Sequence, residues 1–330
     1  MSHDVLTREI GRTGIMASAV GLGTWAIGGW MWGGTDEAAA VRAIEASVEA
    51  GISLIDTAPA YGLGRSEELV GKAIAGRRDK VVIATKCGLN WHHGKGNRFF
   101  EEAGMPVHRY LGADGIAYEV EQSLKRLATD HIDLYITHWQ DPTTPIADTM
   151  EALFRLKAEG KIRAIGASNL SPDELSAYLA TGGLDAIQER YSMLDRGIEQ
   201  TLLPMAEPAG VSTLSYSSLA LGLLTGKVSA ARVFEGDDQR AADPRFSAEN
   251  RQHAADFAAA LAPLAAAQGA SVAQLVIAWT IQRPGITFAL CGARDPSQAI
   301  DNARAASLRL DAAALALIDA AHATHLAAIR

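Results

Sequence analysis

Residues 132–168 contain one complete unit of strand, helix and strand. The unit begins with the apolar run Ile132-Asp-Leu-Tyr-Ile-Thr-His138, continues with helical spacing of apolar residues from Ile146 to Glu159, and ends with Ile162-Arg-Ala-Ile-Gly-Ala-Ser168. Two strands joined through a helix run parallel in one sheet, because parallel strands need a crossover connection of this kind. This stretch therefore predicts a parallel sheet with helices on its outer face.

The same alternation extends over nearly the whole chain. Apolar runs with strand character also occupy residues 19–23, 53–56, 81–86, 186–188, 212–216 and 286–290, and helical spacing occupies residues 37–50, 67–75, 116–127 and 172–179. Residues 5–18 are typical of a short hairpin with a turn at 11–14. We therefore expect a single α/β domain over residues 1–330, a (β/α)8 TIM barrel with an N-terminal β-hairpin and extra C-terminal helices.

Composition narrows the functional classes. The 330 residues are 48% hydrophobic and carry a formal net charge of -8 without a basic cluster, which argues against a nucleic-acid partner. No segment approaches the roughly 18 consecutive apolar residues that span a bilayer, and the N-terminus lacks a signal-peptide pattern, so we expect a cytoplasmic protein with no membrane partner. Cys87 and Cys291 lie outside any metal-ligand spacing, which favours buried free thiols. A homo-oligomer stays open.

Polar side chains gather where the predicted strands end. Barrel enzymes place their chemistry at the C-terminal ends of the strands. Since side chains alternate along a strand, Asp56 and Lys86 should top the columns of side chains that fill the barrel, where a charge requires a partner. We therefore expect these two residues to pair inside a site. The runs end at Asp56, Lys86, His138, Ser168-Asn169, Gln188, Tyr216 and, after the last strand, Gly292-Ala-Arg294.

These stretches resemble the aldo-keto reductase superfamily over nearly the whole chain. Each match is weak alone, but seven in this order are specific. The resemblance implies a nicotinamide-dependent oxidoreductase that reduces a small aldehyde or ketone to the alcohol. The matching segments are Gly21-Leu-Gly-Thr-Trp25, Leu54-Ile-Asp-Thr-Ala-Pro-Ala-Tyr-Gly62, Ala84-Thr-Lys86, Asp133-Leu-Tyr-Ile-Thr-His-Trp139, Ile165-Gly-Ala-Ser-Asn169, Tyr216-Ser-Ser-Leu-Ala-Leu-Gly-Leu-Leu-Thr-Gly-Lys227 and Gly292-Ala-Arg294.

The resemblance implies a catalytic tetrad of Asp56, Tyr61, Lys86 and His138. Tyr61 would be the general acid that protonates the carbonyl oxygen. A phenol with a pKa of about 10 needs roughly 4 kcal/mol of differential stabilisation to titrate near neutrality, and an exposed ion pair supplies about 1 kcal/mol at most. We therefore expect buried Lys86, held charged by Asp56, to lower the pKa of Tyr61. His138 would orient the carbonyl oxygen or relay the proton.

The resemblance also implies NADP(H) as the cofactor, with NAD(H) as the alternative. Tyr216 would stack on the nicotinamide, while Ser168, Asn169 and Gln188 would hydrogen-bond its carboxamide. Further cofactor contacts are implied by two segments. One resembles the stretch that binds the pyrophosphate in the family, and the other resembles the segment that holds the adenosine ribose and its phosphate. These contacts are Ser217, Leu219, Gly222 and Lys227, then Gly292, Arg294, Gln298 and Asn302, with Gly23, Thr24, Trp25 and Asp56 from the first strands.

The sequence departs from the family pattern at the adenosine end. Many members have lysine where Gly292 stands and arginine where Gln298 stands, both for the 2′-phosphate. Here only Arg294 offers that charge, with Asp295 beside it. The cation favours NADP(H), and the neighbouring acid keeps NAD(H) open.

We expect two long loops, residues 90–111 and 225–246, to cover the substrate or the cofactor. The first carries many donors and aromatic rings, which favours a polyhydroxylated, sugar-type aldehyde or ketone. His92 and His93 are adjacent and without a carboxylate at ligand spacing, so we expect no metal. The substrate-binding residues should be Trp25, Trp30, Tyr61, Trp91, His138 and Trp139.

Two alternatives remain. A Schiff-base lyase could use Lys86 as its nucleophile, as barrel aldolases do. A noncatalytic nicotinamide-binding regulatory subunit, like the channel-associated relatives in the superfamily, could keep the fold and the cofactor. Oxidation of NADPH that depends on an aldehyde would favour the reductase over both.

Overall fold

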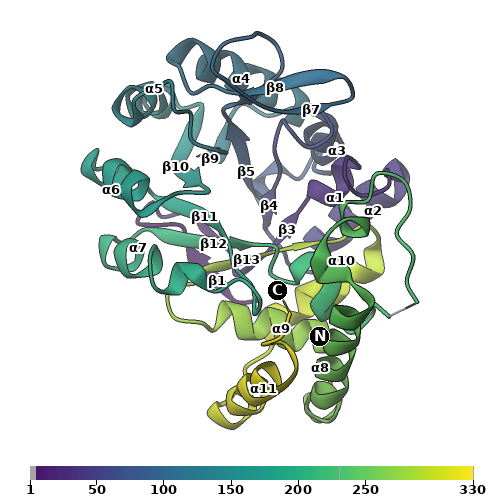
Figure 1. Cartoon of the computed structure of the whole chain (residues 1–330). Helices are drawn as coiled ribbons and strands as arrows, with labels where there is room; N and C mark the ends of the chain where they lie inside the picture. Colours follow the sequence, from purple (N-terminus) through teal and green to yellow (C-terminus); the bar gives the residue numbers. More distant parts are fainter. Residues whose placement is uncertain (1–4, 230, 330) are drawn as a thin grey trace.

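A computed structural model describes residues 5–229 and 231–329 and confirms the predicted barrel (Figure 1). Eight parallel strands close into a cylinder in the order β10-β11-β12-β13-β3-β4-β5-β9. Each predicted run contributes one strand. The strands are β3 (Val20–Gly23), β4 (Leu54–Asp56), β5 (Val82–Cys87), β9 (Ile132–Thr137), β10 (Ile162–Ser168), β11 (Ala186–Arg190), β12 (Ser212–Tyr216) and β13 (Phe288–Gly292).

Helices surround the cylinder, and α8 and α11 pack together beside it as the extra C-terminal helices (Figure 1). The start of α6 illustrates the local signals, because the Ser171 hydroxyl accepts the Glu174 amide hydrogen and the Glu174 carboxylate accepts that of Ser171. The helices are α1 (Trp25–Gly28), α2 (Glu37–Glu49), α3 (Arg65–Ala73), α4 (Ala113–Leu127), α5 (Ile146–Ala158), α6 (Pro172–Ala180), α7 (Leu203–Ala209), α8 (Ala248–Ala267), α9 (Val272–Ile281), α10 (Pro296–Arg304) and α11 (Ala312–His325).

The N-terminal hairpin closes one end of the barrel. Strands β1 (Thr7–Glu9) and β2 (Met16–Ser18) pair antiparallel, and the Gly11 amide donates to the hydroxyl of Ser212 at the start of β12. Buried hairpin side chains join the apolar cluster that fills the barrel. This cluster contains Ile10, Ile15 and Ala17 with Leu54, Val82, Ala84, Leu134 and Ile136. The polar C-terminal ends of the strands therefore lie at the opposite end of the barrel.

Residues 90–111, predicted as a long loop, instead form most of a small antiparallel sheet. Strands β6 (Leu89–Asn90), β7 (Asn97–Glu102) and β8 (Met105–Arg109) pair in the order β6-β8-β7. The turn between β7 and β8 consists of Ala103 and Gly104, with φ of 51° and 78°. Positive φ at both residues matches the twist of paired strands, which is why the hairpin forms here.

The loop at 225–246 is largely irregular in its described residues. It contains short 3-10 helices at Gln239–Ala241 and Pro244–Phe246 and leads into α8. In the part of the chain that the structure describes, no single helix is long and apolar enough to cross a membrane. The pair α8 and α9, bent by 85°, passes the same test of length and composition when the two helices are taken together.

Candidate active site

A buried ion pair lies at the C-terminal end of the barrel strands. The Lys86 Nζ lies 2.9 Å from each carboxylate oxygen of Asp56 and donates to the backbone oxygen of Thr57 at 2.8 Å. Both charged side chains are almost completely buried. The predicted pairing is therefore confirmed, and the carboxylate compensates the cost of burying the ammonium.

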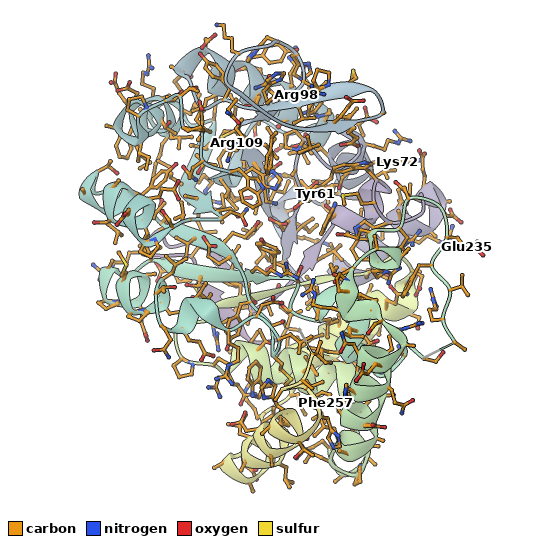
Figure 2. All side chains as sticks on the ribbon, viewed as in Figure 1. Tyr61, Lys72, Arg98, Arg109, Glu235 and Phe257 are labelled. Carbon is orange, nitrogen blue, oxygen red and sulfur yellow. The ribbon has the colours of Figure 1, made fainter. Side chains whose placement is uncertain are left out.

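Tyr61 lies in the segment between β4 and α3, over the centre of the barrel in Figure 2. Its hydroxyl oxygen is 3.2 Å from the Lys86 Nζ. The His138 ring stands edge-on to the Tyr61 ring, with 5.8 Å between centroids. The structure thus brings together all four residues that the resemblance implies as a tetrad.

The electrostatics correct one expectation. Burial, and then the nearby Asp56 carboxylate, raise the pKa of Tyr61 well above its usual value instead of lowering it. Because Asp56 contacts the ammonium directly, its negative charge offsets the field of Lys86 at the phenol. Tyr61 is therefore protonated over the ordinary pH range in this structure, which is the form that a general acid requires.

The two neighbouring bases are shifted in the other direction. Burial lowers the pKa of Lys86, and the Asp56 carboxylate opposes that shift. Burial and the Lys86 charge lower the pKa of His138 well below its usual value. The imidazole is therefore neutral at pH 7, so one ring nitrogen carries hydrogen and the other can accept.

A network of buried hydroxyl groups supports the backbone around the ion pair. The Thr24 hydroxyl donates to the backbone oxygen of Asp56 at 2.9 Å and accepts from the Ser66 hydroxyl at 2.7 Å. The Ser66 hydroxyl also lies 2.9 Å from that of Thr57, whose backbone oxygen binds Lys86. Thr24, predicted to bind the cofactor, is fully buried in this network instead. Ser66 was not predicted as a site residue, and no motif in the sequence indicates its role in this network.

The three residues predicted to bind the carboxamide, Ser168, Asn169 and Gln188, form hydrogen bonds with each other, with the ion pair and with Tyr216, which is predicted to stack on the nicotinamide. The Gln188 amide donates to Asp56 at 2.7 Å, and the Ser168 hydroxyl donates to the Gln188 backbone oxygen at 2.6 Å. The Tyr216 hydroxyl donates to the Asn169 side-chain oxygen at 2.6 Å. These bonds fix the side chains at the wall between β10 and β12.

A cleft of about 500 Å³ runs from the ion pair to α10. Its end near α10 is organised by Arg294, whose guanidinium donates to the backbone oxygens of Trp32 and Gly34 at 3.1 and 2.6 Å. Trp32, Arg232 and Arg240 also line it, and sequence reasoning missed them. The predicted residues in its wall are Gly23, Trp25, Asp56, Tyr216, Ser217, Leu219, Gly222, Lys227, Gly292, Arg294, Gln298 and Asn302.

A smaller pocket of about 190 Å³ adjoins the tetrad. Of the segment 90–111, all of which the structure describes, only Phe100 lines it, so the donors of that segment face elsewhere. Trp91 lies outside both cavities and packs beside His92, with 4.6 Å between ring centroids. The full lining is Trp25, Trp30, Ala60, Tyr61, Leu89, Phe100, His138, Trp139, Ser168, Asn169, Gln188 and Tyr216.

The residues present fit a dinucleotide better than a metal. The cleft is long, continuous with the tetrad, and lined at its far end by cationic side chains that suit phosphate groups. No group of three or more His, Cys, Asp and Glu side chains within the described chain is arranged to hold a metal ion.

Comparison with known proteins gives the family. The model of the Aldo/keto reductase family matches residues 19–323, so the chain belongs to this family of oxidoreductases. It is 47% identical over 293 residues to the aldo-keto reductase YhdN of Bacillus subtilis, covering 88% of this chain and 85% of that protein.

Two further relatives have names that state an activity. An NADH-specific methylglyoxal reductase of Escherichia coli is 41% identical over 307 residues, covering 91% of this chain and 93% of that protein. The solved structure of a glycerol dehydrogenase from Gluconobacter oxydans superimposes with a TM-score of 0.87 at 39% identity, covering 99% of this chain and 97% of that one.

Proposed function

We propose that this chain reduces a small aldehyde or ketone to the alcohol, with NADPH as the reductant and Tyr61 as the general acid. One observation carries the proposal. The side chains of Trp25, Tyr61 and Tyr216 line both the long cleft and the small pocket. The phenol therefore lies where a dinucleotide in the cleft and a carbonyl compound in the pocket would meet.

The reaction needs a proton at the carbonyl oxygen. A bound NADPH would supply the hydride to the carbonyl carbon. Tyr61 donates its proton to the oxygen, so the alcohol leaves a phenolate in the site. The Lys86 ammonium, 3.2 Å from the phenol oxygen, stabilises that phenolate, and Asp56 holds the lysine in place.

His138 orients the substrate. Its neutral imidazole lines the small pocket beside Tyr61, so a ring N–H can donate to the carbonyl oxygen. The ring and the phenol together define where the oxygen lies, and the reacting carbon then faces the cleft. Positioning of this kind lowers the barrier because the reacting atoms are already oriented before the chemical step.

We infer NADP(H) as the preferred cofactor, with NAD(H) as the alternative. Lys227 and Arg294 line the far end of the cleft and suit the additional phosphate of NADPH. Lys227 is well exposed, and its Nζ is 3.8 Å from Asp301. The name of one relative specifies NADH, so the two cofactors need a direct comparison.

The pocket supports a narrower substrate class than the sequence indicates. Its lining is mainly aromatic and aliphatic, and its volume of about 190 Å³ lies below the roughly 300–1,000 Å³ typical of drug-sized ligands. A short carbonyl compound fits better than an extended sugar. Methylglyoxal and glycerol, named in two relatives, are both three-carbon compounds.

The environment of Lys86 argues against the Schiff-base alternative. Its Nζ is surrounded by Asp56, Thr57 and Tyr61 and is almost completely buried, which leaves no approach for a substrate carbon. The regulatory-subunit alternative differs from ours in one respect, because it predicts binding of NADPH without turnover.

The test is a steady-state assay of wild type and Tyr61→Phe with short aldehydes and hydroxyketones, using NADPH and NADH. We expect wild-type turnover with a lower KM for NADPH, and a loss of about 10²-fold or more in kcat in the variant with dinucleotide binding retained. Equal kcat in the two proteins would refute the acid assignment. Binding without turnover in the wild type would favour the regulatory subunit.

A further inference from the structure

An aromatic stack bounds the small pocket on one side. The rings of Trp30 and Phe100 lie 5.0 Å apart, centroid to centroid, with 19° between their planes, and both line the pocket. Trp30 lies in the segment between α1 and α2, whereas Phe100 lies on β7 of the outlying sheet. The stack therefore joins two segments that are distant in sequence at one side of the pocket.

A third segment fixes the backbone next to Trp30. One carboxylate oxygen of Asp237 accepts the amide hydrogen of Met31 at 2.8 Å, and the other accepts that of Gly33 at 2.9 Å. The backbone amide of Gln239 also donates to the backbone oxygen of Met31 at 3.0 Å. These bonds hold the segment of Trp30 against the loop 225–246.

Gly33 permits the two segments to lie close together. Its φ is 73°, in the left-handed region. A Cβ at this position would be 3.3 Å from the backbone oxygen of Glu235. A side chain here would strain the turn and push the loop away from the segment of Trp30.

We propose that the Trp30–Phe100 pair is the size filter of the carbonyl pocket and that Asp237 is the positioning residue that holds Trp30 in it. The inference rests on the proposed function. The stacked rings set the length of substrate that can place its carbonyl against Tyr61 and His138. Short-chain aldehydes and ketones pass this filter, and longer or aryl-extended ones collide with it.

The adjacent residue on β7 gives a matched control. Phe99 packs on Trp139 with 5.3 Å between ring centroids and lies under the Arg109 guanidinium, outside the pocket lining. Phe99→Ala removes the same ring from the same strand, but from behind the lining residues Phe100 and Trp139 and not from the pocket wall itself. Glu235→Gln is the control for Asp237, because Glu235 is an exposed carboxylate of the same loop (Figure 2).

The experiment compares kcat/KM for propanal and octanal in the wild type, Phe100→Ala, Phe100→Leu and Phe99→Ala, with NADPH binding measured by fluorescence. In Phe100→Ala we expect the octanal-to-propanal ratio of kcat/KM to rise about tenfold or more. Phe100→Leu should give a smaller rise in the same direction. Phe99→Ala should keep the wild-type ratio, and the Kd for NADPH should be the same in all four proteins.

The Asp237 arm separates positioning from folding. Asp237→Ala should raise the octanal-to-propanal ratio of kcat/KM by a smaller factor than Phe100→Ala. The change should act through KM, with kcat for propanal retained. Glu235→Gln should leave the ratio and kcat for propanal unchanged. If Phe100→Ala and Phe99→Ala are both active and both keep the wild-type octanal-to-propanal ratio of kcat/KM, the size filter is overturned and the proposed function is unaffected. A wild type that binds NADPH and turns over neither aldehyde would overturn the proposed function together with this inference.

Discussion

The two ends of the barrel use the same strands for opposite purposes. Towards the hairpin, Leu54, Ala84 and Ile136 belong to the apolar cluster that fills the barrel interior. Two residues further along the same strands, or just past them, are Asp56, Lys86 and His138. One end is closed by burial of apolar surface, and the other carries the charged pair Asp56 and Lys86, which is nearly as well buried.

The difference shows what a buried charge requires. The apolar end is stabilised by area alone, which is non-directional and tolerates changes of shape. The polar end depends on particular partners, since Lys86 is surrounded by two carboxylate oxygens and a backbone oxygen. We therefore expect substitutions at the two ends to affect stability and turnover in different proportions.

Lys86→Met should have the largest effect on stability. It leaves the Asp56 carboxylate buried without its cation, which costs about 3–5 kcal/mol of the free energy of unfolding. The additional change Asp56→Asn should restore part of that loss, because the charge itself is then removed. Urea denaturation measures both, and a single variant as stable as wild type would show that the pair is not needed.

At the opposite end, Ile10→Ala should cost about 2–4 kcal/mol of unfolding free energy, since it leaves a cavity under a fully buried side chain. Because the hairpin is remote from the tetrad, kcat for reduction should stay within about twofold of wild type at a temperature where the variant is folded. A large fall in kcat would mean that the two ends are coupled.

The outer face of β5 offers a third environment. Glu119 on α4 accepts the amide hydrogen of Gly88 at 2.9 Å, and burial raises its pKa to about 8. Between pH 5 and 8 the unfolded carboxyl has lost its proton while the folded one keeps it, so the unfolding free energy falls as pH rises. The slope is about 1.4 kcal/mol per pH unit for one group.

Glu119→Gln should remove that part of the slope. Burial also raises the pKa of Glu189 to about 8, so the variant should keep the contribution of that second residue. Urea denaturation at several pH values measures the change. Identical slopes in wild type and variant would show that Glu119 ionises normally in the folded protein.

The smallest effect concerns pH and rate. With Tyr61 protonated and His138 neutral, neither group titrates between about pH 6 and 9, so kcat for reduction should be nearly flat across that range. A profile of initial rates at saturating substrate tests this. An inflection near pH 7 that disappears in His138→Gln would contradict the neutral imidazole.

Periodicity and strand-end chemistry were sufficient to predict the barrel and the Asp56–Lys86 pair. Both follow from local rules, namely alternation along a strand and the need of a buried charge for a partner. The small sheet at 89–109 was missed because its turn uses Ala103, whereas Asn or Asp is the usual signal at such a position.

Other features depend on contacts that sequence position does not encode. The Thr24 side chain lies in the hydroxyl network beside Asp56, and Trp91 lies outside the pocket lining. Arg294 is held by backbone oxygens of a segment more than 250 residues earlier in the chain. The pKa of Tyr61 depends first on the burial of the phenol and then on the nearby Asp56 carboxylate, and only coordinates show either of them.

The coupling of the Tyr61 phenol to the Lys86 ammonium makes the two groups one catalytic unit in the proposed reaction. Its most direct test is the single-turnover rate of NADPH oxidation by propanal in wild type, Tyr61→Phe, Lys86→Met and the double variant. We expect each single change to slow the step by about 10²-fold or more and the double variant to be no slower than Tyr61→Phe. If the rate loss in the double variant equals the product of the two single losses, the two groups act independently and are not one catalytic unit.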